Sequence, residues 1–212
     1  MRIFAVTPIH VPEDELRRRQ ARYDALCPSG IRVDLRDIGV AAPTALDTDQ
    51  QVRDSAGLVR AALETAPDDA DALLPDCVLD PGVSALAGRL ERPVFGLLRS
   101  TIAWQRAAGR QVAAVTRNAA IATEFGRVAA EYGYADCLTT VEVLDLDVAA
   151  IADSARWAEA LAAAASRLGS LGAAAVVNGC SAVDLPAQRR AAVPLIDPTA
   201  LTLRLIAAGE AA

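Results

Sequence analysis

An apolar, strand-like run that ends next to a cysteine occurs twice in this chain. Residues 72–77 read ALLPDC and are followed by PVFG at 93–96. Residues 175–180 read AVVNGC and are followed by PLID at 194–197. Each unit predicts a strand, a cysteine at its carboxyl end, a short helix and a second strand that begins with proline. This duplication favours two similar halves, each built around its own sheet.

Along the rest of the chain, short apolar runs alternate with longer segments of helical period. Strands are expected at residues 2–6, 31–35, 71–75, 93–98, 111–116, 136–141, 173–178 and 193–196. Helices are expected at residues 12–26, 48–65, 82–90, 118–132 and 147–168, with a last helix that starts at 198 and ends before Gly209. Such alternation is typical of parallel sheets covered by helices, so the predicted fold class is α/β.

Composition excludes several classes of function. The chain of 212 residues has 21 basic and 27 acidic side chains, and this net charge of −6 disfavours nucleic acid as a partner. It contains no lysine, which excludes Schiff-base chemistry and a P-loop. A single histidine and the absence of a CxxC pair disfavour a metal site. A small-molecule substrate is the expected partner, and the alanine-rich helices favour a homo-oligomer.

The hydropathy pattern and the cysteines indicate the cellular compartment of the protein. No stretch approaches the ~18 apolar residues of a membrane span, and the first apolar run is too short for a signal peptide. The four cysteines lie far apart in a chain that is too large to need disulfides. We therefore expect a cytoplasmic protein with reduced thiols and no contact with a membrane.

Cys77 and Cys180 hold equivalent places in the repeat, at strand ends where α/β sheets bind ligands. If the two halves face each other, one thiol lies on each wall of a cleft. One thiolate could then remove a proton from a stereocentre while the other thiol protonates the opposite face, because a thiol pKa of about 8.5 lies near neutrality. This chemistry needs no metal and no cofactor. Cys27 and Cys137 lie outside the repeat and are expected to be structural.

Four segments carry a resemblance to a known family. Residues 77–82 (CVLDPG) resemble a C-F-x-D-P-G motif, and residues 179–181 (GCS) resemble a G-C-[AS] motif. Residues 134–141 (YADCLTTV) stand where the family has a G-L-A-D-R-x-x-S-V-type stretch, and residues 193–197 (VPLID) match its I-P-V-I-D strand. The family is that of the hydantoin and allantoin racemases, in the aspartate/glutamate racemase superfamily.

The resemblance implies two pseudo-symmetric flavodoxin-like lobes with parallel sheets and an active-site cleft between them. We expect the first lobe at residues 1–97 and the second at residues 98–196, with the final helix, 197–212, packed back on the first lobe. It also implies cofactor-independent racemisation by Cys77 and Cys180.

Three segments depart from the family pattern. Residues 6–10 (VTPIH) replace a strand followed by I-N-P-N-T, residues 96–100 (GLLRS) replace G-I-G-E-A, and residues 115–117 (VTR) replace V-T-T. These loops are expected to contact the substrate, so hydantoin and allantoin are not carried over as substrates. Arg99 and Arg117, both at expected strand ends, suggest a carboxylate or another anionic group on the ligand.

The candidate substrate-binding residues adjoin the two cysteines or the strand ends: Thr7, Val78, Asp80, Arg99, Thr116, Arg117 and Ser181. Some also suit a structural role. Asp80 directly precedes Pro81, which favours a helix cap over an acid. His10, in the exit loop of the first strand, is expected to be a surface or hydrogen-bonding histidine. The run at residues 17–19 (RRR) is expected on the solvated face of the first helix.

The leading functional hypothesis is a racemase or epimerase that inverts a carbon next to a carbonyl in a small carboxylate- or amide-bearing molecule, such as an amino acid derivative. A one-sided lyase or isomerase on the same scaffold, such as a decarboxylase or a cis–trans isomerase of an unsaturated diacid, is the first alternative. A non-catalytic metabolite-binding protein is the second. The presence of both Cys77 and Cys180 argues against a decarboxylase that uses a single cysteine.

Overall fold

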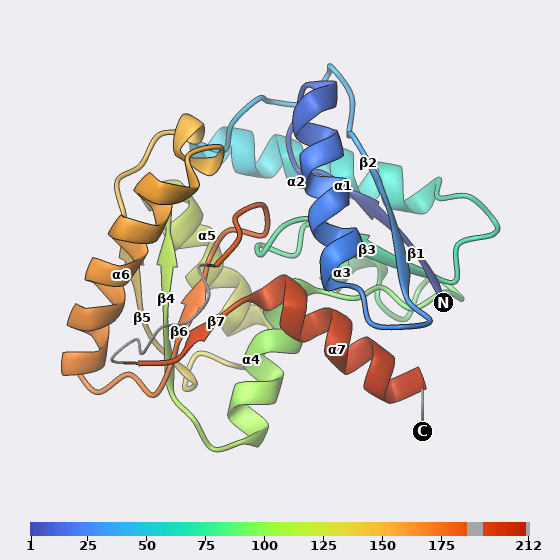
Figure 1. Cartoon of the computed structure of the whole chain (residues 1–212). Coiled ribbons are helices and arrows are strands. Elements are labelled where there is room, and N and C mark those ends of the chain that lie inside the picture. The colour runs from blue at the N-terminus through green and yellow to red at the C-terminus, as the bar shows by residue number, and fades with distance from the viewer. Residues whose placement is uncertain (186–192, 211–212) are drawn as a thin grey trace.

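Two parallel sheets, one from each half of the chain, form the frame of the protein in a computed structural model that describes residues 1–185 and 193–210 (Figure 1). The first sheet has the order β2-β1-β3 and contains β1 (Arg2–Val6), β2 (Arg32–Arg36) and β3 (Ala72–Pro75). The second has the order β5-β4-β6-β7 and contains β4 (Val112–Thr116), β5 (Leu138–Val143), β6 (Val176–Asn178) and β7 (Leu195–Ile196). The predicted α/β class is confirmed.

The two sheets repeat the same order of pairing. In each, the first strand of the half lies between the second and the third. Where β7 pairs with β6 in the second sheet, Val94 forms a single parallel bridge with Leu73 of β3 in the first. β3 and β4 are buried along their whole length, as expected for parallel strands covered on both faces by helices.

Within the described ranges, eight helical segments cover the sheets. They are α1 (Glu13–Leu26), α2 (Asp49–Glu64), α3 (Val83–Leu86), α4 (Leu97–Ala107), α5 (Ala119–Glu131), the 3₁₀ helix η1 (Val148–Ile151), α6 (Ser154–Ser170) and α7 (Pro198–Glu210). The first turns of α2 and α5 are capped by Thr48 and Asn118, whose side chains accept from the amides of Gln51 and Ile121. In the described part of the chain, no helix is long and apolar enough to cross a membrane.

The two halves share one hydrophobic core. A single cluster of buried side chains includes Leu74 of the first sheet, Ile102 of α4, Phe125 of α5 and Leu203 of α7. The last helix runs from the second half back under α1 and contacts α1 and α4 (Figure 1). This shared core holds the two sheets in a fixed relation. The proposed lobe boundaries stay a prediction.

The expected strand at 93–98 is wrong beyond its one bridge. Helix α4, which the local pattern did not predict, begins at Leu97. The Asp80 carboxylate explains the start, because it accepts from the amides of Leu98 (3.0 Å) and Arg99 (2.8 Å). This cap comes from a residue far away in the sequence, so the local pattern of apolar residues could not reveal it.

Three of the expected helices differ from the observed ones by more than a cap residue. The helix expected at 82–90 has only four residues, since Gly82 (φ 80°) and Gly88 (φ 77°) turn the chain on either side of it. The helix expected at 147–168 is interrupted between η1 and α6, and each part has its own aspartate cap, Asp147 and Asp153. Helix α7 continues through Gly209.

Candidate active site

A cavity of about 60 Å³, here called the central cavity, lies where strands from both sheets end. Its wall is built from the segments that follow β1, β3, β4 and β6, together with side chains of α1, α5 and η1. Most of this wall is apolar. The two halves therefore close around one small site at the carboxyl ends of their strands, where parallel sheets bind ligands.

Both predicted catalytic cysteines belong to the wall of this cavity. Cys77 follows β3 in the first half, and Cys180 follows β6 in the second. Both are free thiols, and Cys77 is the more deeply buried. Cys137 is buried elsewhere and donates to the carbonyl of Arg110 (3.1 Å), as a structural cysteine would.

The two thiols have similar backbone surroundings and different charges around them. The amide of Leu79 bonds the sulfur of Cys77, and the amide of Ala182 bonds that of Cys180, each two residues further on. Burial raises the pKa of both thiols above the ordinary value. The sequence predicts a helix after each cysteine. In the structure α3 is short, residues 181–185 contain a turn and a bend but no helix, and the next seven residues lie outside the described part of the chain.

Asp76 connects the two segments that carry Cys77 and Cys180, here called the cysteine turns. Asp76, directly before Cys77, accepts from the hydroxyl of Tyr23 (2.9 Å) and faces a guanidinium nitrogen of Arg19 (3.4 Å). The main-chain oxygen of Asp76 accepts from Oγ of Ser181 (3.0 Å), the residue directly after Cys180. This hydrogen bond joins the two halves beside the two thiols.

Arg117 is in the wall of the central cavity, at the end of β4 as expected. Its guanidinium pairs with Asp47 (2.6 Å) and donates to the carbonyls of Leu46 (3.3 Å) and Leu146 (3.2 Å). These partners come from loops of both halves. The charge of Arg117 is thus already compensated, and the side chain holds the two loops over the cavity.

Of the other predicted binding residues, Val78 and Ser181 contribute to the wall, and four residues do not. Thr7 and Thr116 each donate to the carbonyl two residues further on, so they shape the turns that follow β1 and β4. Asp80 points away from the cavity and caps α4. Arg99 lies in α4 and not at a strand end, which corrects its expected position, and its guanidinium donates to a main-chain carbonyl.

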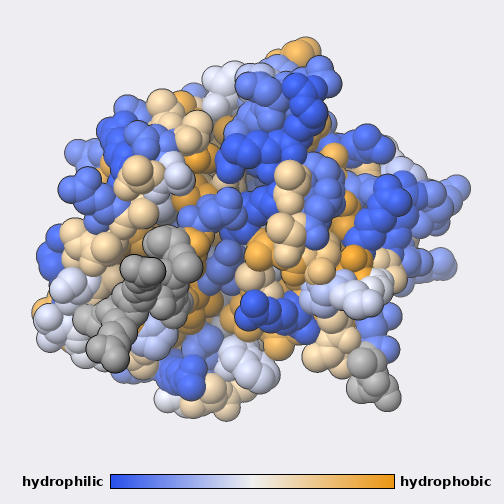
Figure 2. All heavy atoms as spheres, viewed as in Figure 1, coloured by the Kyte–Doolittle hydropathy of each residue, from blue (hydrophilic) through white to orange (hydrophobic). Residues whose placement is uncertain are grey.

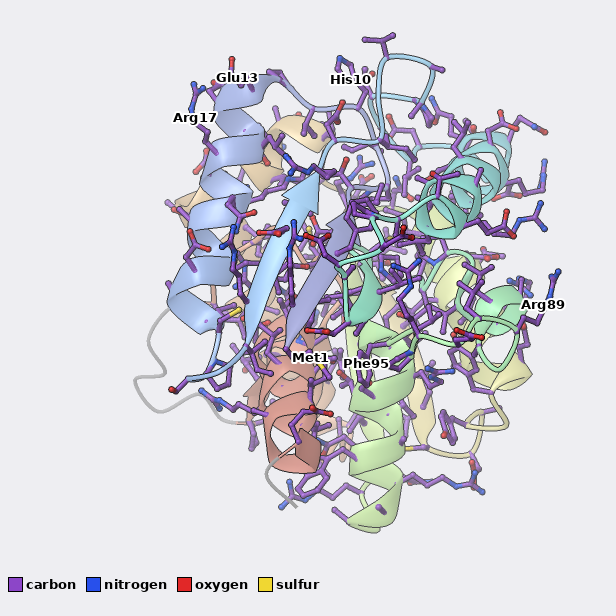
Figure 3. The ribbon with its side chains drawn as sticks, turned by 90° about the vertical axis from the view of Figure 1, so that its right-hand side faces the viewer. Met1, His10, Glu13, Arg17, Arg89 and Phe95 are labelled. Atoms are coloured by element: carbon purple, nitrogen blue, oxygen red, sulfur yellow. The ribbon has the colours of Figure 1, made fainter. Side chains whose placement is uncertain are left out.

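His10 lies beside the site and not in its wall. It lines a second hollow of about 400 Å³, which shares Ile9, Arg19 and two residues of η1 with the central cavity, and its Nδ1 pairs with Asp37 (2.7 Å). Figure 3 shows His10 at the opposite end of the first sheet from Met1, above the strand ends. The Asp37 carboxylate fixes the orientation of this histidine, and the hollow is here called the His10 hollow.

Sequence reasoning missed Arg19, Asp76 and Tyr23. Figure 2 shows hydrophilic residues gathered over α1, yet Arg19 on that helix is only 4% exposed. A signal was present, because Leu16, Arg19, Tyr23 and Leu26 recur at spacings of three and four and therefore share one helix face. That face packs inward, and the expectation of three solvated arginines is wrong for Arg19.

Comparisons with known proteins agree with this architecture. Among solved structures, the allantoin racemase of Pseudomonas fluorescens superposes with a TM-score of 0.86 at 15% identity, over 98% of this chain and 90% of the other. The allantoin racemase of Klebsiella pneumoniae gives a TM-score of 0.78 at 20% identity, over 100% and 88%. The glutamate racemase of Campylobacter jejuni gives 0.60 at 13% identity, over 99% and 86%.

At these identities the structures show a shared fold. A search of curated protein sequences finds no match. The family model described as Asp/Glu/Hydantoin racemase matches residues 17–206, which is most of the chain and spans both cysteine turns. The chain therefore belongs to the Asp/Glu/Hydantoin racemase family and is an isomerase of the racemase type.

Proposed function

We propose that the protein is a cofactor-independent racemase or epimerase that inverts a carbon next to a carbonyl group, with Cys77 and Cys180 as its two acid–base groups. One observation carries the proposal: the two thiols come from different halves of the chain and belong to the wall of a single cavity. The bond from Ser181 to the main chain of Asp76 supports it by holding the two turns together. A proton can then leave toward one wall and return from the other.

The chemical step balances within this site. The thiolate of one cysteine takes the proton of the stereocentre, so an S–H bond forms and the C–H bond breaks. The electron pair moves onto the carbonyl oxygen as an enolate. The thiol of the other cysteine then gives its proton to the opposite face of the carbon, and the pair returns from oxygen. The configuration of the carbon is now inverted, and the second cysteine is left as the thiolate.

The charges around the cavity favour an amide-bearing substrate over a dicarboxylate. The two arginines in the described wall are both paired with carboxylates, Arg117 with Asp47 and Arg19 with Glu15 and Asp76. A substrate with two carboxylates would enter a mainly apolar cavity without a free cation to compensate it. A small neutral ring with amide groups avoids this cost. Two structural relatives are allantoin racemases, so allantoin is the first substrate to test.

The test follows single enantiomers of allantoin, a 5-substituted hydantoin, aspartate and glutamate by circular dichroism, and by proton NMR in deuterated water. We expect inversion of at least one neutral substrate, with exchange of the hydrogen on the inverted carbon. Cys77→Ser and Cys180→Ser should each abolish inversion. Cys27→Ser is the matched control, since Cys27 lies outside the cavity, and should keep wild-type turnover.

Unchanged turnover in both cavity variants would refute the two-thiol mechanism. Release of carbon dioxide without inversion would instead establish a lyase on this scaffold.

A further inference from the structure

One arginine of the central cavity keeps a donor that the protein does not use. The side chain of Arg19 is 5% exposed and lies in the wall of both the central cavity and the His10 hollow. Its Nε donates to Glu15 (2.7 Å), and its Nη1 faces Asp76 (3.4 Å). Among the described residues, no group accepts from Nη2, and this atom is not fully buried. A guanidinium held on two sides therefore presents its third nitrogen to a ligand.

Arg117, by contrast, has no terminal nitrogen without a partner. Both of its terminal nitrogens donate to main-chain carbonyls, and Nη2 also pairs with Asp47. These bonds join loops of the two halves, so releasing them to bind a substrate would open the cavity. Of the two arginines in the described wall, Arg19 is the one that can bind a substrate without losing a bond.

The local charge suits a neutral group that becomes negative during reaction. Glu15 is shared between Arg19 and Arg18, which holds both of its oxygens (2.7 and 2.8 Å). Asp76 is balanced by Arg19 and the hydroxyl of Tyr23. The cluster of Arg18, Arg19, Glu15 and Asp76 thus carries no net charge. It does not attract a carboxylate strongly, but it can stabilise a charge that develops on an oxygen close to Nη2.

Arg19 also faces the second cysteine. Burial raises the pKa of Cys180, and the positive charge of Arg19 opposes that rise. Asp76 raises the pKa of both thiols, but no arginine of the described ranges opposes the rise at Cys77, and Asp80 raises the pKa of Cys77 further. The charge of Arg19 therefore makes the Cys180 thiolate easier to form than the Cys77 thiolate, and the free Nη2 belongs to the same side chain.

We propose that Nη2 of Arg19 binds the substrate carbonyl oxygen next to the stereocentre and stabilises the negative charge on that oxygen while the carbon is deprotonated. The inference rests on the proposed racemase function and names the residue that makes the enolate accessible. When the C–H bond breaks and the S–H bond forms, the electron pair shifts to the oxygen that Arg19 holds. It returns to carbon when the second thiol gives up its proton, so Arg19 neither gains nor loses a proton.

The experiment compares Arg19→Met, Arg19→Lys and a matched control, Arg17→Met. Arg17 lies on the same helix, is 65% exposed and pairs with Glu13 (2.5 Å), and it points away from the molecule (Figure 3). The enzyme is assayed on the neutral substrate with the highest wild-type turnover among allantoin and the 5-substituted hydantoin. Thermal unfolding of each variant shows whether it is folded.

We expect Arg19→Met to lower kcat by about 10²–10³-fold, the usual effect of losing one donor to a developing oxyanion, with KM changed only a few-fold. Arg19→Lys keeps the positive charge next to Asp76, so it should fold like the wild type and recover part of kcat. Arg17→Met should match the wild type. A folded Arg19→Met enzyme with wild-type kcat, or a loss confined to KM, would overturn the proposal.

A second measurement does not depend on turnover. Alkylation by iodoacetamide at one fixed pH, followed by mass spectrometry of the peptides, reports the thiolate fraction of each cysteine. Arg19→Met should slow alkylation of Cys180 and leave that of Cys27 unchanged. An unchanged rate at Cys180 would contradict the placement of Arg19 beside this thiol. If the wild type neither inverts nor exchanges any substrate, the proposed function fails, and this rate alone then tests the placement.

Discussion

The replacement of Asp80 by asparagine tests whether burial or hydrogen bonding controls the carboxyl that caps α4. Asp80 is 4% exposed and has a left-handed backbone (φ 50°) in the turn after Cys77. It accepts from the amides of Leu98 and Arg99, and the hydroxyl of Tyr132 donates to it (3.2 Å). Burial outweighs these donors and raises the pKa of Asp80 to about 7.

The sign of the effect follows from proton binding. Between the pKa of about 4 in the unfolded chain and about 7 in the folded protein, the folded state holds more protons, so stability falls as the pH rises through this window. A shift of about 3 pKa units corresponds to about 4 kcal/mol. The asparagine side chain does not titrate, so the stability advantage of the wild type over Asp80→Asn should shrink by up to about that amount between pH 4 and pH 8.

Chemical unfolding of wild type and Asp80→Asn at several pH values measures this difference. Asp68→Asn, in an exposed loop, is the control for the loss of one carboxylate and should change stability little. Arg99, Tyr132 and Cys77 also face Asp80, but they are present in both proteins, so their contributions largely cancel. A difference that is constant, or that grows as the pH rises, would mean that the capping amides keep the carboxyl ionised, and the argument from burial would be wrong.

Two further substitutions test the frame around the cysteines. Ser181→Ala removes the hydrogen bond to the main chain of Asp76 and should cost about 1 kcal/mol of unfolding free energy by denaturant titration, together with a measurable loss of kcat. Wild-type stability and kcat would show that the two turns are held by other contacts. Gly179→Ala would place a methyl group 2.2 Å from the main-chain oxygen of Val115, so we expect about 1–3 kcal/mol or more of destabilisation and slower inversion. Gly126→Ala on α5, where nothing lies within 4 Å, should instead keep or raise the melting temperature, and equal effects of the two glycine variants would contradict the steric argument.

The alternation of short apolar runs with segments of helical period was enough to predict the α/β class, because parallel strands need connections long enough to hold a helix. The duplicated pattern of strand, cysteine and proline placed Cys77 and Cys180 at strand ends, and the structure brings both to one cavity. The pairing order β2-β1-β3 repeats as β5-β4-β6, as expected for two similar halves.

What the sequence could not reveal depends on contacts between distant residues. Helix α4 was missed because its first amides are capped by Asp80, from the other side of α3. Arg19 was assigned to solvent because three consecutive arginines usually form a solvated face. The helical phase of Leu16 and Tyr23 argued for the inside, but the burial of a guanidinium needs partners such as Asp76, which the sequence alone could not place beside it.

The two halves contribute equivalent thiols in unequal electrostatic surroundings. Because the proposed reaction is a racemisation, this difference cannot change the equilibrium between the enantiomers. Asp76 disfavours both thiolates and Asp80 disfavours that of Cys77, whereas Arg19 and Arg22 favour that of Cys180. Two enantiomers in solution have the same free energy, so the ratio of kcat to KM must be the same in both directions. The inequality between the two thiols therefore cannot favour one product at equilibrium. It can only set how kcat and KM divide between the directions. The enantiomer deprotonated by Cys180 meets the more populated of the two singly deprotonated forms of the enzyme.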